Sequence, residues 1–424
     1  MLRKITGLIV GLFLWTVSSA QEYALIYDSI KTNFYFQSFE KLNSNLRAPQ
    51  KSKERLNQWK NLHIKKIGSW GEEYFEQSLD FIYKNPVNLL SLDGGGIRGI
   101  IPAAILSELE AILRKKNTHD LDLCDCFDKL AGTSTGGILA LGLTVAQPGN
   151  PGKTLYTASD LLDFYLTHGK SIFKKSPKQF VRSLGGIIDE KYDSKGMNHV
   201  MQQIFGDAKL SNLKKDVMIP AYDIKHSKPF VFSKKMAIDQ PENDFFVWQV
   251  IRATSAMPTY FECAKIQSSS GNEYHLIDGG VFANNPSLYL LTEILKENLH
   301  KGNGLETIEI NLLSLGTGEV RKQYEYKDVK NWGLHSWTRP LMDMMMNGVD
   351  DLVHEHLKQL FQQNIIRGKY YRINPKLTPD INPDMDDCHE KNISALYDLA
   401  MQTVEKEKNN LENWADMLLE KKDS

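Results

Sequence analysis

The chain has 424 residues, of which 42% are hydrophobic, and its formal net charge at pH 7 is −1. This length and apolar content are sufficient to bury a substantial core. The balanced charge lacks the basic footprint of a nucleic-acid-binding protein and the acidic blocks typical of disordered chains. We therefore expect a folded protein without a nucleic-acid partner, and the composition leaves its oligomeric state open.

Residues 1–20 predict a secretory signal peptide. A charged start at 3–4 is followed by an apolar run over 5–17 and by small residues at 18–20, which suit cleavage. The apolar run is shorter than the roughly 20 residues that a membrane-spanning helix needs. We therefore favour cleavage over a membrane anchor, and we expect export to a periplasmic or secreted location.

Residues 21–85 predict a mainly helical N-terminal extension. Within it, Trp59, Leu62 and neighbouring apolar residues have roughly helical spacing among several lysines and arginines. One interpretation is an interfacial helix on anionic lipid. The other is a helix packed on the following domain with a solvated basic face, which the narrow apolar stripe favours.

A second domain over 86–424 begins with an alternation of short apolar strands and helical patterns. The predicted strands lie at 87–92, 127–131, 217–222, 230–232, 275–277 and 308–315, and the predicted helices at 100–115, 137–145, 246–255 and 287–298. This alternation predicts an α/β fold whose mostly parallel central sheet carries helices on both faces. The motifs fall within 87–318, while 321–424 is predicted to be mostly helical and to end in a polar helix at 395–419.

The first motif is DGGGIRG, from Asp93 to Gly99, between the first strand and its helix. Consecutive glycines leave backbone N–H groups unobstructed, and at a helix N-terminus these donors suit an anion. That anion is either a phosphate, because Gly94, Gly96 and Gly99 fit a dinucleotide fingerprint, or the oxyanion of an attacked ester. A simple tight turn is the third interpretation.

The second motif is a G-x-S-x-G, Gly132 to Gly136, between a predicted strand and a predicted helix. That context is typical of a nucleophile elbow, in which a strained turn exposes the Ser134 hydroxyl and the flanking glycines avoid clashes. An acyl hydrolase needs both this motif and the glycine loop, whereas a nucleotide site needs only the loop. The pair therefore favours a hydrolase.

A serine nucleophile requires a base. One candidate is Asp278, which with Gly279 and Gly280 follows a short strand and has the alternative role of a turn aspartate. To act as base, it must lie within about 3 Å of the Ser134 hydroxyl. The other candidates, which would give a Ser–His–Asp carboxylesterase, are downstream histidines that we expect to be surface or packing residues: His300, His335, His354, His356 and His389.

The four cysteines predict neither a disulfide scaffold nor a metal site. Four cysteines in a chain of this length do not form a disulfide framework, although pairings among them stay open. A metal site around Cys124 and Cys126 would lack a second matching pair of ligands. We expect neither metal nor cofactor, and the four cysteines are Cys124, Cys126, Cys263 and Cys388.

In their order, DGGGIRG, GTSTG and DGG resemble the patatin-like phospholipase family. Segments at 256–261, 281–286, 314–318, 332–334 and 385–387 also resemble plant patatins, so the similarity covers roughly 87–405. The resemblance implies a three-layer sandwich, a catalytic domain over 86–424, and hydrolysis of acyl esters in phospholipids or galactolipids at a membrane surface. A non-catalytic phosphate- or lipid-binding protein is the remaining alternative.

The same resemblance implies roles for individual residues. Ser134 would be the nucleophile and Asp278 its only base, without a histidine. The backbone N–H groups of Gly95 and Gly96 would form the oxyanion hole, with Arg98 shaping or charging it. One departure is Met257, where alanine is more usual in the family.

The stretch 341–353 is rich in methionine and lies on a predicted helix. Because methionine adapts to varied shapes, this stretch is a candidate wall for acyl chains. Apolar residues at helical spacing are more often ordinary core, and we favour that interpretation.

Overall fold

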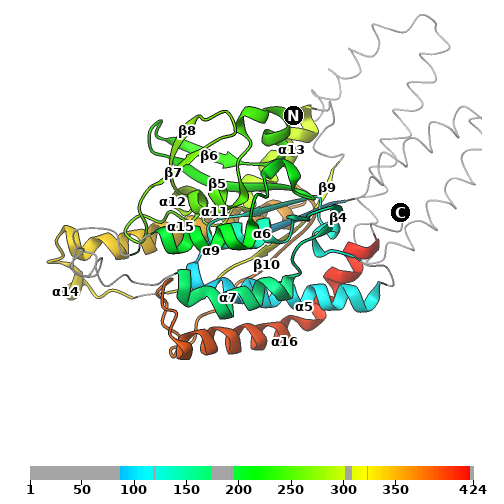
Figure 1. Cartoon of the computed structure of the whole chain (residues 1–424). Helices are drawn as coiled ribbons and strands as arrows, with labels where there is room; N and C mark the ends of the chain where they lie inside the picture. Colours follow the sequence, from blue (N-terminus) through cyan, green and yellow to red (C-terminus); the bar gives the residue numbers. More distant parts are fainter. Residues whose placement is uncertain are drawn as a thin grey trace, which may run out of the picture. The chain divides into compact units, whose positions relative to one another are not determined.

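The computed structural model describes residues 86–117, 121–172, 192, 194–300, 308–321 and 323–420 (Figure 1). The predicted signal peptide at 1–20 and the predicted extension at 21–85 lie outside the described residues. Both therefore stay predictions.

A sheet of eight strands forms the centre of the described chain, in the order β10-β9-β1-β2-β5-β8-β7, with β6 beside β5. Neighbours from β10 to β5 pair in parallel, whereas β6, β7 and β8 pair antiparallel, so the predicted mostly parallel sheet is confirmed. The strands of this sheet are β1 (Val87–Leu92), β2 (Lys129–Gly132), β5 (Asp216–Asp223), β6 (Lys228–Phe232), β7 (Ala264–Gln267), β8 (Glu273–Asp278), β9 (Glu309–Leu315) and β10 (Arg367–Ile373). A separate hairpin pairs β3 (Ala146–Gln147) with β4 (Asn150–Thr154).

Helices cover both faces of the sheet. Figure 1 shows α5, α7 and α16 together on one side, and the packing clusters place α13 and α15 on the other. The helices are α5 (Ile100–Lys116), α6 (Thr135–Gly142), α7 (Ala158–Ile172), α9 (Ser194–Phe205), α10 (Lys234–Asp239), α11 (Val247–Thr254), α12 (Gly280–Ala283), α13 (Ser287–His300), α14 (Tyr326–Val329), α15 (Leu334–Gln362) and α16 (Glu390–Glu420). The 3₁₀ turns are η3 (Gly96–Gly99), η4 (Leu123–Cys126), η5 (Leu210–Asn212) and η6 (Pro241–Asn243).

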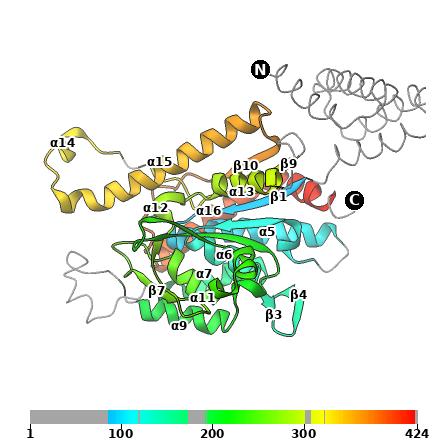
Figure 2. The same cartoon turned by 90° about the horizontal axis from the view of Figure 1, so that it is seen from above.

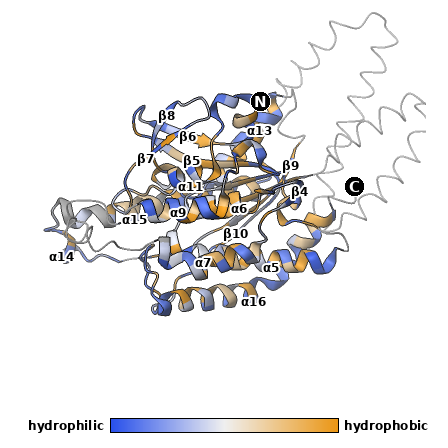
Figure 3. Cartoon of the chain, viewed as in Figure 1, coloured by the Kyte–Doolittle hydropathy of each residue, from blue (hydrophilic) through white to orange (hydrophobic). Residues whose placement is uncertain are grey.

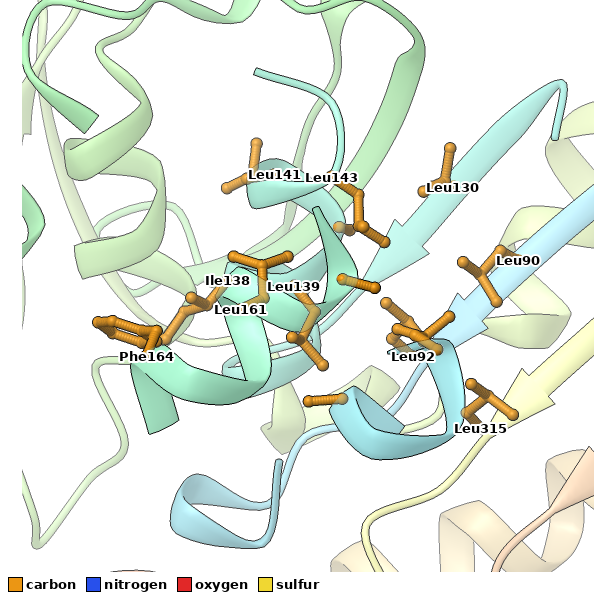
Figure 4. Close-up of a cluster of buried hydrophobic side chains, with 14 of the residues drawn as sticks. Leu90, Leu92, Leu130, Ile138, Leu139, Leu141, Leu143, Leu161, Phe164 and Leu315 are labelled. Atoms are coloured by element: carbon orange, nitrogen blue, oxygen red, sulfur yellow. The ribbon is translucent and has the colours of Figure 1, made fainter. Parts of the chain in front are cut away.

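Alternation along β1 explains why the fold has three layers. Successive side chains of a strand point to opposite faces, so Leu90 and Leu92 enter the core beneath α5 and α7 (Figure 4). Leu89 enters the second core, which α13 and α15 close. A strand that is apolar on both faces has to be covered on both, and this is the environment of a central parallel strand.

The C-terminal part contains one strand that the sequence did not reveal. β10 pairs in parallel with β9 at the edge of the sheet, so the prediction of a mostly helical 321–424 was incomplete. Its sequence, RGKYYRI, is polar because an edge strand keeps side chains in contact with water. The predicted polar helix is α16, and its apolar stripe packs on α5, as the mixed blue and orange residues of Figure 3 illustrate.

The prediction that 341–353 is core was wrong. Leu341, Met344, Met345 and Leu352 are exposed, and Val353 is buried. The reason is visible in Figures 1 and 2, where the first half of α15 projects beyond the sheet together with α14. None of the helices that the structure describes combines the length and apolar content needed to cross a bilayer.

The four cysteines are free thiols. Asp122, beside the first pair, forms an ion pair with Lys214 at 2.6 Å and also accepts a hydrogen bond from the Thr154 N–H at 2.9 Å. The acidic group next to these cysteines thus has a structural role in joining η4 to neighbouring segments.

Candidate active site

A strained turn joins β2 to α6 at Ser134. The backbone of Ser134 has φ 52° and ψ −119°, a conformation that side-chain-bearing residues rarely adopt. Its N–H donates to the Thr254 hydroxyl at 3.0 Å, and that hydroxyl donates to the Pro220 carbonyl at 2.6 Å. Thr254, which no sequence pattern singled out, therefore ties the turn to β5.

Steric contacts require glycine at both positions that flank this turn. A Cβ on Gly132 would lie 2.1 Å from the Gly136 carbonyl oxygen, and a Cβ on Gly136 would lie 2.2 Å from the Leu92 carbonyl oxygen. Neither carbonyl oxygen can move away, because Gly136 belongs to α6 and Leu92 belongs to the central strand β1. A Cβ would come within 2.4 Å of a neighbouring atom at three further motif glycines, Gly94, Gly99 and Gly279.

The antiparallel strand β8 brings Asp278 level with Ser134. In the register of the sheet, Ala131 pairs with Met218, and Ala221 pairs with Asp278. Ser134 and Ala221 each lie three residues beyond the first pair, so β5 extends past the end of β2 and presents Asp278 beside the turn. The Ser134 hydroxyl and the Asp278 carboxyl group line the same cavity, and the hydroxyl is close enough to lower the pKa of Asp278.

The environment of Asp278 shifts the pKa of its carboxyl group toward neutrality. Its side chain is buried, and burial raises the pKa of Asp278 to about 7. The hydrogen bond from the Gly280 N–H, at 2.7 Å, and the nearby Ser134 hydroxyl both lower the pKa but do not cancel the effect of burial. A carboxylate with such a pKa takes a proton more readily than an ordinary aspartate.

The loop after β1 presents two backbone donors to the same place. The N–H of Gly94 donates to the Asn284 carbonyl at 3.1 Å, and the N–H of Ile97 donates to the Met385 carbonyl at 2.8 Å. Between them, the N–H groups of Gly95 and Gly96 have no acceptor among the residues that the structure describes. Both glycines line the cavity that contains the Ser134 side chain.

Close contacts fix the shape of this loop. A Cβ on Gly95 would lie 2.1 Å from the Thr317 Oγ1, and the same hydroxyl donates to the Gly94 carbonyl at 2.7 Å. Gly96 has φ 60°, and a Cβ there would lie 2.1 Å from the Met385 carbonyl oxygen. Arg98 is buried, and its Nε donates to the Gly95 carbonyl at 3.3 Å, so it holds the loop from within.

A buried polar network supports the loop from the far side. Asp93 forms an ion pair with Arg372 at 2.5 Å, and Arg372 also donates to the Ser314 hydroxyl at 2.7 Å. The Asn284 side-chain amide donates to Asp350 at 2.8 Å, and burial raises the pKa of Asp350 to about 7. No sequence pattern singled out Arg372 or Asp350, and Asn284 and Thr317 appeared only within segments of family resemblance.

Two cavities of opposite character meet at this loop. The first, of about 50 Å³, contains Ser134 and Asp278 and is otherwise mainly apolar, with Met257 in its wall. The second, of about 130 Å³, is mainly polar and contains Arg98 and Asp350. The side chains shared by both cavities are Tyr260, Asn284, Met346 and Met385.

The side chain of His335 lies outside the described residues. The histidine side chains that the structure describes lie away from the candidate site. None lines either cavity. His354 forms a hydrogen bond with the Tyr370 hydroxyl at 3.0 Å, and His300, His356 and His389 are exposed. The acidic side chain that lines the cavity together with Ser134 is Asp278.

Comparison with known proteins identifies the family. The family model described as patatin-like phospholipase matches residues 90–291. Patatin-like protein 2 of Arabidopsis thaliana is 38% identical over 314 residues, which cover 69% of this chain and 76% of the relative. Patatin-like protein 2 of Oryza sativa subsp. indica is 32% identical, and the match covers 76% of this chain and 84% of that relative. A protein of Solanum tuberosum titled probable inactive patatin-3-Kuras 1 is also 32% identical, and the match covers 76% of this chain and 87% of that relative. This chain belongs to the patatin-like phospholipase family.

Proposed function

We propose that this protein hydrolyses acyl ester bonds in phospholipids or related lipids, with Ser134 as nucleophile and Asp278 as base. The family suggests a lipid acyl hydrolase, but one relative is titled probable inactive, so the residues of this chain have to support the activity. The observation that carries the proposal is one cavity lined by Ser134, by the buried Asp278 and by Gly95 and Gly96, whose N–H groups have no acceptor among the described residues.

Acylation follows from this arrangement. Asp278 takes the proton of the Ser134 hydroxyl while the Ser134 Oγ attacks the ester carbonyl carbon. The resulting oxyanion accepts hydrogen bonds from the Gly95 and Gly96 N–H groups, an interaction that is worth about 3 kcal/mol per donor in serine hydrolases. Asp278 then protonates the departing alcohol oxygen, and the acyl group stays on Ser134 as an ester.

Deacylation repeats the same proton transfers with water. Asp278 removes a proton from a water molecule, and the hydroxide attacks the acyl-enzyme carbonyl. The N–H groups of Gly95 and Gly96 stabilise the second oxyanion. When it collapses, the C–O bond to Ser134 breaks, the Ser134 Oγ recovers the proton from Asp278, and the fatty acid leaves.

The two cavities suit the two parts of a lipid ester. An acyl chain belongs in the apolar cavity beside Ser134, and the polar remainder belongs in the cavity lined by Arg98 and Asp350. The volume of the apolar cavity is smaller than that of typical ligand pockets, which start at about 300 Å³. Long chains therefore require side chains to move, and four flexible methionines line the cavity: Met197, Met257, Met346 and Met385.

Mass spectrometry of phosphatidylcholine vesicles incubated with the purified protein tests this function. The wild type is expected to release fatty acid and lysolipid, and Ser134→Ala to lower the rate at least about a thousandfold. His354→Ala serves as the control for the Ser–His–Asp alternative and is expected to keep the rate within about threefold. Lipid binding without release by the wild type, or full activity of Ser134→Ala, would refute the proposal.

We also propose that the protein is exported, on the strength of the leader pattern at 1–20. Protein recovered from outside the cytoplasm should begin at or close to Gln21 when its N-terminus is sequenced. An intact N-terminus on protein retained in the cytoplasm would exclude this.

A further inference from the structure

Helix α15 carries an exposed apolar stripe that lies outside both hydrophobic cores. Five large apolar side chains follow one another along it at intervals of four, three, one and seven residues and lie within a sector of about 100°, given the 3.6-residue helical repeat. Each of them is between 36% and 58% exposed. The stripe consists of Trp337, Leu341, Met344, Met345 and Leu352.

The opposite face of the same helix already has its partners. Val353, Leu357 and Phe361 are buried in the core that α13 shares, and Met346 lines both cavities of the candidate active site. A surface helix with one face on the core normally carries polar residues on the other. An apolar stripe on that second face therefore indicates a further binding surface.

The position of the stripe indicates what covers it. One turn of α15 supplies Met345 to the stripe and Met346 to the wall of both cavities. The same part of the helix projects beyond the sheet (Figures 1 and 2), so a broad flat surface can reach it. A lipid bilayer against the stripe would lie next to the site at which its lipids are to be cleaved.

We propose that the α15 stripe is the face with which this protein docks on a lipid bilayer. This inference rests on the proposed lipid hydrolysis and adds the surface that delivers the substrate. Interfacial helices insert apolar side chains to the depth of the headgroup boundary, where tryptophan is also favoured. The stripe supplies Trp337 at one end and leucine and methionine over the next four turns.

The charge of α15 defines the kind of bilayer. The helix contains four acidic residues against two basic ones, so it does not attract anionic headgroups. Docking then depends on apolar burial, which salt does not screen. The bilayer that fits the stripe is zwitterionic, and its binding is insensitive to ionic strength.

Two matched double variants of the full chain test the proposal. Leu341→Glu/Met345→Glu changes side chains that are 48% and 51% exposed in the stripe. Leu299→Glu/Ile238→Glu introduces the same charges at positions that are 50% and 54% exposed on α13 and α10. Flotation with phosphatidylcholine vesicles at low and high salt measures binding. Hydrolysis is measured on those vesicles and on soluble p-nitrophenyl butyrate.

The stripe variant is expected to lose vesicle binding and vesicle hydrolysis by about tenfold or more, because two apolar side chains that the bilayer would bury become charged. Its rate on the soluble ester should stay within about twofold of wild type. The control variant should match wild type in every assay. A wild type that floats but cleaves neither substrate would refute the proposed hydrolysis while leaving docking supported.

Three results would overturn the proposal that the α15 stripe docks on a bilayer. The first is vesicle binding by the stripe variant equal to that of wild type, and the second is an equal loss of both hydrolytic activities. The third is a wild-type oligomer, seen by light scattering, that becomes monomeric in the stripe variant without losing vesicle binding. That last outcome would assign the stripe to contact between copies of this chain.

Discussion

Replacement of Asp278 by asparagine should stabilise the protein while abolishing its activity. Burial raises the pKa of Asp278 from the ordinary 3.8 to about 7, so the folded state resists ionisation of this group. Between these two pH values the folded protein binds more protons than the unfolded chain, and the free energy of unfolding of the wild type falls as pH rises. An asparagine of nearly the same shape carries no such dependence.

The magnitude follows from the size of the shift. A difference of about three pKa units corresponds to about 4 kcal/mol once the pH exceeds 7, and to nothing below about pH 3. The opposing effects of the Gly280 N–H and the Ser134 hydroxyl are already contained in the net shift, so the expected gain stays at about 4 kcal/mol. Asp278→Asn should therefore be more stable than wild type at pH 8.5 and nearly equal to it at pH 4.5.

Urea unfolding of both proteins at pH 4.5 and pH 8.5 measures this difference directly. The activity of the wild type on a soluble ester provides the second readout, because Asp278 acts as a base only when ionised. The rate at limiting substrate should rise with pH through about 7. A stability difference between the two proteins that is the same at both pH values would refute the reasoning, as would activity that is already maximal at pH 5.

Other substitutions test the residues that surround Ser134 and Asp278. Thr254→Val removes both hydrogen bonds that tie the elbow to β5, and should lower the free energy of unfolding by about 1–3 kcal/mol and the soluble-ester rate by at least about tenfold, with Thr254→Ser restoring both. Gly96→Ala strains a backbone with φ 60° and meets a carbonyl, so the rate should fall at least about a hundredfold while circular dichroism stays native. Arg372→Met leaves Asp93 buried without its partner and should cost about 3–5 kcal/mol in urea unfolding, which Asp93→Asn in the same chain should partly restore.

The parallel half of the sheet was predictable because its signals are local. A buried parallel strand is a short apolar run, and β1 and β9 carry such runs between glycine-rich turns. The elbow was predictable for the same reason, since the spacing of two glycines around Ser134 reflects contacts within a few residues. What these segments share is that their structure is decided by their own sequence.

The rest depended on partners distant along the chain. β10 is polar because it is an edge strand, so its sequence resembles a surface helix as much as a strand. Arg372 on β10 and Asp350 on α15 reach the site only because these elements pack beside β9. The prediction that 341–353 is core was wrong for a related reason. Periodicity shows that a helix has an apolar side, but it does not show which face the core covers.

The candidate site concentrates features that oppose stability, and their clustering is itself an argument for function. Ser134 has a strained backbone, Asp278 is a carboxyl group buried where ionisation is unfavourable, and the Asn284 Oδ1 is buried without a hydrogen-bond partner among the described residues. Each costs about 1–3 kcal/mol or more. Proteins retain such groups where the chemistry requires them, and a non-catalytic lipid-binding protein would have no need of a strained serine against a buried base. The three-layer core offsets these costs, since the strands that carry the site are apolar on both faces.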